Sequence, residues 1–183
     1  IVSESLWHSV HDKGNHGYGG LWGGTPATFH HNLVAHHSNR TPRLCGSRYS
    51  NRADMEKVDL CNNVIYNWTS EGAYGGQGGS YNILNNYYKL GPASVANGTH
   101  ARFFTAYVDK GSEEYPQAAG VYGHFYLSGN VIDNTRTDLS SSQQAEVAAA
   151  NADNTSSTAF VVKDERNAAE ITTAVEASDL LAP

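Results

Sequence analysis

The sequence has few charged residues and lacks long hydrophobic runs. Only 16% of its residues are charged, against about a quarter in an average domain. A length of 183 residues excludes both a disulfide miniprotein and a large multidomain enzyme. No apolar run approaches the roughly 18 residues of a membrane span, and no basic leader with a small-residue cleavage site opens the chain. The sequence therefore predicts neither a transmembrane helix nor a signal peptide.

Helix-forming residues are scarce except near the C-terminus, which argues against an all-α fold. The chain instead has 18 glycines and 16 asparagines, two residue types that adopt left-handed turn conformations readily. This composition is typical of turn-rich β structure.

The formal net charge of −6 argues against a general nucleic-acid-binding protein. Residues 1–70 nevertheless hold six basic and five acidic residues, whereas residues 71–183 hold six basic and thirteen acidic ones. Four arginines lie between residues 40 and 52 with no acidic residue among them. This basic segment in an acidic protein predicts an anionic ligand.

Short apolar stretches built around asparagine recur along the chain. Asn32, Asn63, Asn86 and Asn130 follow one another at intervals of 31, 23 and 44 residues. We interpret the last interval as two steps of 22, with a strand at 101–108 between them. A period near 22 with one strand-turn-strand unit per repeat favours a β-solenoid whose equivalent asparagines form a hydrogen-bond ladder. A β-sandwich with asparagine-rich turns is the alternative.

Two regions are predicted. Residues 1–137 form the solenoid coils, and residues 138–183 form an extension that packs on them. Within the extension, Gln143 to Ala150 and Asp164 to Ala177 are rich in Ala and Glu and are predicted to be short helices. Residues 1–6 alternate as a buried strand does, which suggests that the chain is a fragment or a processed product.

Nine histidines raise the possibility of a metal site, particularly at His30-His31 and His36-His37. Adjacent residues of a strand point to opposite faces, so each pair offers one ligand to a common site. Because no known metal-ligand spacing occurs, stacked turns and strands are the preferred interpretation of these histidines.

The most specific local pattern is the segment Arg40-Thr41-Pro42-Arg43. Proline fixes its own backbone and favours an extended preceding residue, so both arginines are held on a rigid segment. Guanidinium groups held in this way bind carboxylates in a bidentate manner. Solubilising surface arginines are the alternative for this pattern alone.

Together with other blocks, these residues resemble the pectate lyases of the first polysaccharide lyase family. The resemblance covers about residues 1–132, and the order of its motifs is more specific than any one of them. The blocks are Ser3 to Leu6, His11 to Gly20, Phe29 to Leu33, Arg40 to Arg43, Asn62 to Trp68 and Asn85 to Lys89.

The resemblance implies an all-β, right-handed parallel β-helix that cleaves polygalacturonate by calcium-assisted β-elimination outside the cell. Arg40 matches the family's proton-abstracting arginine and Lys13 its substrate-binding lysine, while Arg43 grips a uronate carboxylate. A further basic residue of the family has Cys45 in its place here, and Arg48 is the candidate substitute. An arginine base requires a strongly cationic, partly desolvated site or alkaline pH.

The family's calcium-binding carboxylates would precede Ile1, so none is predicted in this chain. Either another segment supplies them, or the chain is a non-catalytic β-helix that binds acidic polysaccharide. In the second case it stacks on itself or on an N-terminal β-helix segment through an open first coil. A glycoside hydrolase is less favoured, because no carboxylate pair flanks Arg40.

The two cysteines, Cys45 and Cys61, are 16 residues apart. Their spacing is compatible with a disulfide if the loop at 46–57 bulges outward, and equally with two reduced thiols. Together with four N-glycosylation sequons, they are compatible with a secreted glycoprotein. The sequons begin at Asn39, Asn67, Asn97 and Asn154.

Overall fold

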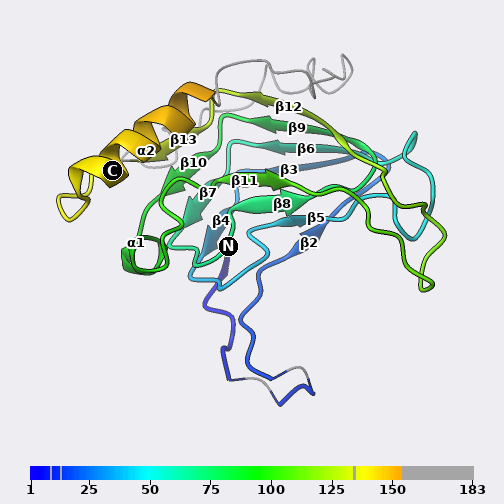
Figure 1. The fold of residues 1–183 in the computed structure, drawn as a ribbon, viewed down its shortest axis with the longest axis horizontal. Helices are drawn as coiled ribbons and strands as arrows, with labels where there is room; N and C mark the ends of the chain where they lie inside the picture. The colour runs from blue at the N-terminus through cyan, green and yellow to red at the C-terminus, as the bar shows by residue number, and fades with distance from the viewer. Residues whose placement is uncertain (9, 13, 134, 154–183) are drawn as a thin grey trace.

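The computed structural model describes residues 1–153, apart from residues 9, 13 and 134. Its strands form three parallel sheets (Figure 1). We number these sheets in the order in which the chain visits them. Sheet 1 consists of β2 (Leu21–Trp22), β5 (Arg43–Leu44), β8 (Ala73–Gly75) and β11 (Phe104–Ala106). Sheet 2 consists of β3 (Ala27–His30), β6 (Lys57–Cys61), β9 (Ser80–Leu84) and β12 (His124–Ser128). Sheet 3 consists of β1 (Val2–Ser3), β4 (Leu33–Ala35), β7 (Val64–Tyr66), β10 (Tyr87–Lys89) and β13 (Val131–Asp133).

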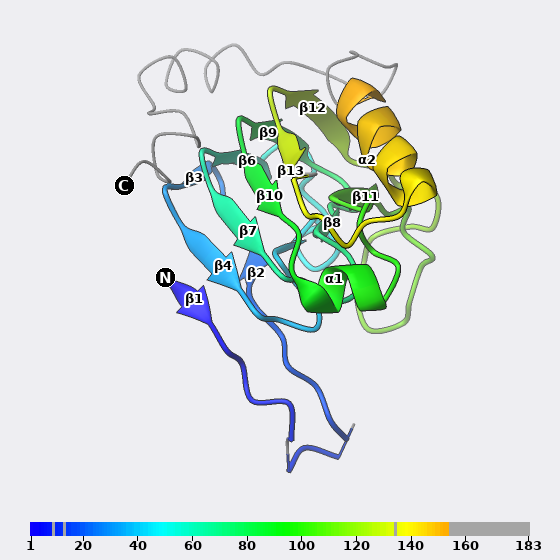
Figure 2. The same cartoon turned by 90° about the vertical axis from the view of Figure 1, so that its left-hand side faces the viewer.

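After β1, the chain passes through sheets 1, 2 and 3 in the same order four times. Equivalent residues of successive strands are aligned, so that Leu33, Val64, Tyr87 and Val131 are register partners in sheet 3. Figure 2 shows the strands of sheet 3 side by side and facing the viewer, with the other two sheets behind them. The predicted all-β architecture with stacked repeats is therefore correct at the level of parallel, in-register sheets.

The predicted division of the last interval into two steps of 22 residues is wrong. β10 pairs directly with β13, 44 residues further along the chain. The strand expected at 101–108 is β11, and it pairs with β8 in sheet 1 rather than forming a separate repeat. This passage through the three sheets is long because the connection at 90–103, which contains α1, and the loop at 107–123 are both longer than their counterparts in the preceding passage.

The core is built by strand residues that alternate between the interior and the outside. In β6, Val58 and Leu60 point into a cluster that also contains Tyr81, Ile83 and Phe125. A second cluster lies towards sheet 3 and the helices, around Ile65, Trp68, Tyr88 and Val147. β-branched and aromatic side chains fill these positions because they pack well on a pleated surface.

The predicted asparagine ladder is confirmed. It lies at the turns between sheets 2 and 3, where the Oδ1 of each asparagine accepts both N–H groups of the one before. These distances are 3.0 Å from Asn32 to Asn63, 3.0 Å from Asn63 to Asn86, and 2.9–3.0 Å from Asn86 to Asn130. At Asn63 and Asn86 the ladder also satisfies a buried backbone N–H that the turn would otherwise leave unpaired.

The N-terminal strand and the helices differ in part from what the sequence predicts. The N-terminal strand is two residues long and exposed rather than buried over residues 1–6. A helix, α1 (Pro92–Ala96), was not predicted. The predicted helix at 143–150 is confirmed but longer, as α2 (Ser141–Asp153), and the one at 164–177 lies outside the described residues. Within the described part of the chain, neither helix has the length and apolar content to cross a membrane.

Candidate functional site

Arg40 lies in the connection from β4 to β5, on a segment fixed by neighbouring backbone. Gly19 and Gly20 donate hydrogen bonds to the carbonyl oxygens of Asn39 and Arg40, at 2.9 and 2.8 Å. A Cβ at Gly19 would clash with the backbone oxygen of Arg40, so only glycine permits this approach. Arg40 has a φ of 59°, and its guanidinium carbon lies 4.5 Å from the ring centroid of Tyr18.

Arg43 lies on the outer face of sheet 1. It is the register partner of Tyr74 on β8, and its guanidinium carbon lies 5.7 Å from the Tyr74 ring centroid. Burial lowers the pKa of Arg43, and the positive charges of Arg48 and Arg40 lower it further. The structure therefore brings the three predicted arginines within electrostatic reach of one another.

Arg48 follows β5 and is held between two tyrosines. Its guanidinium carbon lies 5.5 Å from the ring centroids of both Tyr49 and Tyr115. The Tyr115 ring comes from the loop at 107–123, so Arg48 connects sheet 1 with that loop. Cation–π contacts of this kind orient a guanidinium group without neutralising its charge.

Within the described part of the chain, Arg40, Arg43 and Arg48 form no ion pair with an acidic residue, whereas three other arginines do. The pairs are Arg52 with Asp54, Arg102 with Glu71 and Arg136 with Asp138. The Nε atoms of Arg43 and Arg48 are buried and have no hydrogen-bond partner. A buried donor without a partner is costly, so these two groups can gain stability from an anionic ligand.

Sequence reasoning did not identify the carboxylate next to this cluster. Glu71 is only 8% exposed, and it accepts hydrogen bonds from Tyr107 Oη at 2.7 Å and from Arg102 at 3.3 Å. Burial and the bond to Glu71 raise the pKa of Tyr107 to about 12. The Tyr107 ring lies 5.3 Å from that of Tyr74, which is the register partner of Arg43. Because Tyr107 donates a hydrogen bond to Glu71, this carboxylate holds Tyr107 against the aromatic ring that Arg43 contacts. No local motif marks Glu71, because its partners lie more than 30 residues away.

A hollow of about 560 Å³ continues this surface beside β11. It contains one cation, Lys110, and the aromatic side chains of Tyr107 and Tyr115. Its full lining is Gln77, Thr105, Ala106, Tyr107, Val108, Lys110 and Tyr115. Lys13, the predicted partner of Arg40, lies outside the described residues.

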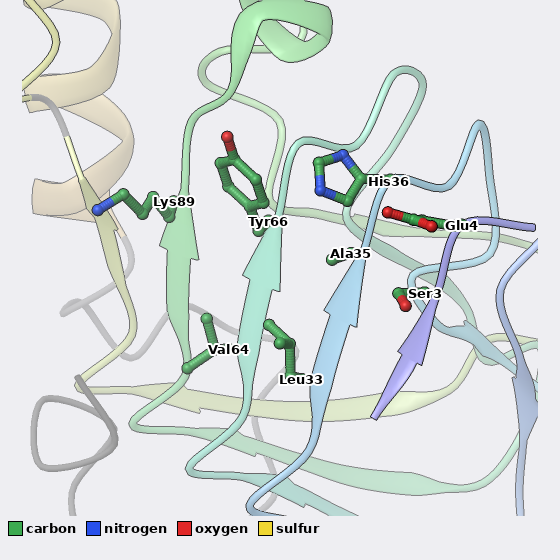
Figure 3. Close-up of a pocket in the computed structure, with 8 residues that line it drawn as sticks. All are labelled: Ser3, Glu4, Leu33, Ala35, His36, Val64, Tyr66 and Lys89. Atoms are coloured by element: carbon green, nitrogen blue, oxygen red, sulfur yellow. The ribbon is translucent and has the colours of Figure 1, made fainter.

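A second hollow, of about 380 Å³, lies on the outer face of sheet 3, away from the arginines. Figure 3 shows Leu33 and Val64 on its floor, with Tyr66 and His36 on the same side of the sheet. Lys89 and Glu4 lie at opposite ends of the row. This hollow combines an apolar floor with two opposite charges and does not share the cationic character of sheet 1.

The histidine pairs behave differently from each other. His36 is exposed and His37 is buried, but the pair follows the end of β4 and His36 has a φ of 59°, so a turn and not strand alternation separates the two side chains. At the other pair the prediction of opposite directions is wrong, because the chain turns at His31 (φ of 54°) and the two Nδ1 atoms lie 2.6 Å apart. Among the described residues, no group of three or more metal-ligating side chains comes together.

Cys45 and Cys61 are free thiols, which corresponds to the second of the two alternatives that their spacing left open. Cys45 follows β5 and lies beside Gly23. It is also near the carboxylate of Glu56, the residue directly before β6. Cys61 ends the same strand, five residues beyond Glu56 and therefore roughly 16 Å away along extended chain. Burial raises the pKa of both thiols, and that of Cys61 to about 12.

The sequon asparagines differ in how far their side chains are already engaged. Asn39 Oδ1 accepts the Arg40 backbone N–H at 2.6 Å, and Asn67 bonds both to Ala93 and to His36. Asn97 is exposed at the end of α1. Asn154 lies outside the described residues.

A scan against protein-family models finds no match for this chain, and a search of curated proteins finds none either. The geometry and charge of the site therefore carry the functional conclusion.

Proposed function

We propose that the protein binds an acidic polysaccharide along the outer face of sheet 1 and acts as a pectate lyase-like enzyme on polygalacturonate. One observation carries this proposal. Arg40, Arg43 and Arg48 come together on that face without an acidic partner among the described residues. A guanidinium fork matches the geometry of a uronate carboxylate, and a polyuronate presents such carboxylates repeatedly.

The architecture supports a right-handed parallel β-helix as the scaffold. The chain visits three parallel sheets in constant order, and equivalent residues are stacked in register. Connections between parallel strands are right-handed in nearly all proteins. Stacked strands place functional side chains of successive rounds in a row, as with Arg43 and Tyr74, which suits an extended polymer.

In the proposed reaction, Arg40 takes the C5 proton of a uronate while Lys13 and Arg43 hold its carboxylate. The electron pair of the C5–H bond forms a C4–C5 double bond as the C4–O glycosidic bond breaks, and the leaving oxygen takes a proton from water. Burial and the positive charges of Arg48 and Arg40 lower the pKa of Arg43. The same charges stabilise the negative charge that develops at the uronate as the proton leaves.

Calcium enters the proposal only through the resemblance to pectate lyases. Among the described residues no cluster of carboxylates or histidines fits a metal ion, so no step is assigned to the metal here. The assay below is therefore run with and without added calcium.

Binding is tested first, by isothermal titration of oligogalacturonate into wild type, Arg43→Ala and the control Arg52→Ala. The control removes the same charge from an exposed arginine that Asp54 already neutralises. We expect Arg43→Ala to weaken binding roughly tenfold or more and Arg52→Ala to leave it unchanged. Equal affinities for all three proteins would remove sheet 1 from the proposal.

Lyase activity is tested by the ultraviolet absorbance of unsaturated uronate product at alkaline pH. We expect Arg40→Ala to abolish product formation while retaining measurable binding. Equal rates for wild type and Arg40→Ala would exclude Arg40 as the base. Binding without any product, with or without calcium, would favour the non-catalytic alternative.

That alternative is a β-helix that binds polysaccharide and assembles with itself. It is favoured by exposed apolar side chains at the end of the stack where β1, β2 and β3 are edge strands. Leu6, Trp7, Val10 and Leu21 are 84%, 51%, 106% and 48% exposed. Edge strands with apolar neighbours are templates for pairing with another chain.

Sedimentation velocity over a range of concentrations separates assembly from a monomeric state. If the alternative holds, Leu21→Lys should abolish association. Val131→Lys is the matched control, because Val131 is 46% exposed at the opposite edge of the stack. A single monomeric species at all concentrations would contradict self-assembly.

A further inference from the structure

The hollow beside β11 lies in line with the arginines of sheet 1. Arg43, Tyr74 and Thr105 are register partners on three neighbouring strands, and Thr105 lines the hollow. Because neighbouring strands are about 4.8 Å apart, the hollow begins roughly 10 Å from Arg43 along the stack. A polymer that extends from the arginines across the strands towards β11 therefore reaches this hollow.

Tyr115 connects the hollow with Arg48. Its ring centroid lies 5.5 Å from the guanidinium carbon of Arg48, and the same residue lines the hollow. Tyr107, the second aromatic residue of the lining, is held by its hydrogen bond of 2.7 Å to Glu71. The C–H groups on the apolar side of a sugar ring pack on aromatic faces of this kind. The hollow thus continues the cationic cluster with a surface suited to a sugar ring.

The loop at 107–123, which follows β11 in Figure 1, is held in place from within. Asp109 is 2% exposed, and its carboxylate accepts hydrogen bonds from the Gly111 N–H and from Gln117 Nε2, both at 2.8 Å. Gln117 also donates to the carbonyl oxygen of Gln77 at 2.8 Å, which attaches the loop to the preceding round. A wall that is ordered before binding lowers the entropic cost of binding.

Two polar side chains of the lining can bind a ligand. Gln77 is 6% exposed, and its Oε1 is buried without a hydrogen-bond partner. The terminal torsion of glutamine is broad, so this amide can turn towards a hydroxyl group in the hollow. Lys110 is exposed and forms no ion pair with an acidic residue in the described part of the chain. Glu113 and Glu114 belong to the same loop but do not line the hollow.

We propose that the hollow binds one further uronate residue of the polysaccharide, beyond the part that the arginines hold. This inference rests on the proposed function of sheet 1. The sugar ring packs on Tyr115, one of its hydroxyl groups donates to Gln77, and its carboxylate pairs with Lys110. The volume of about 560 Å³ lies within the range of roughly 300–1,000 Å³ that is typical of ligand sites. Affinity therefore depends on the length of the oligomer, because a short one bound at the arginines does not reach the hollow.

Isothermal titration with galacturonate oligomers from the trimer to the hexamer tests the proposal. In the wild type we expect the affinity to rise roughly tenfold or more once the oligomer reaches the hollow. Gln77→Leu combined with Lys110→Gln should abolish this rise and leave the affinity for the trimer unchanged. Lys89→Gln is the control, because it removes a charge from an exposed lysine of sheet 3, and it should retain the rise.

The outcomes separate this inference from the proposed function. If Arg43→Ala weakens binding of every oligomer and the double variant equals the wild type at every length, the hollow is not a binding site, whereas sheet 1 still is. If the wild type binds none of the oligomers, the proposed function fails and this inference fails with it.

Hydrogen exchange of the wild type gives a second readout that needs no substitution. Binding of the hexamer should slow the exchange of backbone amides at 107–123, because the bound ring opposes opening of this loop. The trimer should leave their exchange unchanged. No effect of the hexamer, or an equal effect of both oligomers, would overturn the inference.

Discussion

Single asparagine side chains connect the successive rounds of this fold. The Nδ2 of Asn86 donates to the Leu60 carbonyl at 2.8 Å and to Asn130 at 2.9 Å, while its Oδ1 accepts two N–H groups of Asn63. Asn86 is 1% exposed, so water cannot replace these bonds. Asn86 therefore connects groups from three rounds of the chain.

We predict that Asn86→Ala lowers the free energy of unfolding by about 3 kcal/mol, because it leaves a buried N–H and a buried carbonyl unpaired. Asn15→Ala is the control, since Asn15 is exposed, and it should change stability by less than about 0.5 kcal/mol. Urea unfolding of both variants provides the measurement. Similar midpoints for the two would argue against an energetic role of the ladder.

A buried carboxylate makes stability depend on pH. Glu56 accepts hydrogen bonds from Gly24 at 3.2 Å and from Tyr81 at 3.3 Å, and its burial raises its pKa above the ordinary 4.5. Above pH 4.5 the folded state therefore binds more protons at Glu56 than the unfolded state does. The contribution of Glu56 to stability is fully present below that pH and is lost as pH rises through the raised pKa.

Relative to Glu56→Gln, the wild type should lose stability as pH rises from below 4.5. Asp54→Asn is the control with the opposite sign, because hydrogen bonding to Arg52 lowers the pKa of Asp54. Its contribution should be small at an exposed site and should be lost as pH falls. The free energy of unfolding of the three proteins is measured at several pH values across the acidic range. If it changes with pH in the same way for wild type and Glu56→Gln, the raised pKa of Glu56 is contradicted.

At the scale of elements, α2 closes one end of the core through a few residues. Val147 is fully buried in the cluster that contains Ile132 and Leu139, and Asn151 bonds the backbone of β13. His100, which precedes β11, lies 2.8 Å from Glu146 through its Nε2. The helix is thus attached by packing and by polar contacts on the same face.

Val147→Ala should cost about 2 kcal/mol of stability, from the lost burial of two methyl groups and the cavity that remains. Ala148→Ser, at an exposed position of the same helix, should cost less than about 0.5 kcal/mol. Thermal unfolding distinguishes the two outcomes. A wild-type melting temperature for Val147→Ala would mean that α2 is not part of the cooperative core.

At the scale of the whole molecule, a local cationic face belongs to a chain with a net charge of −6. The arginines of sheet 1 attract a polyanion, whereas the remaining acidic surface repels it. Both contributions are electrostatic, but the short-range contacts at the arginines release counterions on binding. Binding should therefore weaken as salt rises.

We expect the affinity for oligogalacturonate to fall roughly tenfold between about 0.05 and 0.2 M salt. Arg43→Ala should reduce this salt dependence, and Arg52→Ala should retain it. Titrations at several salt concentrations provide the slopes. An affinity that does not change with salt would contradict recognition by the arginine cluster.

Local patterns in the sequence were sufficient for the asparagine ladder and for the closeness of Arg40 and Arg43, but not for the length of every round. The turn asparagines sit between apolar stretches, so their recurrence marks the equivalent turns. Arg40 and Arg43 are close in sequence and flank one proline, so their proximity required no long-range contact. These features depend on near neighbours or on a strict repeat, and both are visible in one chain.

Only the tertiary structure decided the rest, because parallel strands pair across tens of residues. The 44-residue round follows from the pairing of β10 with β13, which an interval divisible into two steps of 22 could not reveal. Glu71 reaches Tyr107 over 36 residues, and Asp59 is buried on a face that strand alternation alone would leave open to solvent. Side-chain partners and burial are set by the stacking of distant segments, whereas the turns that permit this stacking are encoded locally.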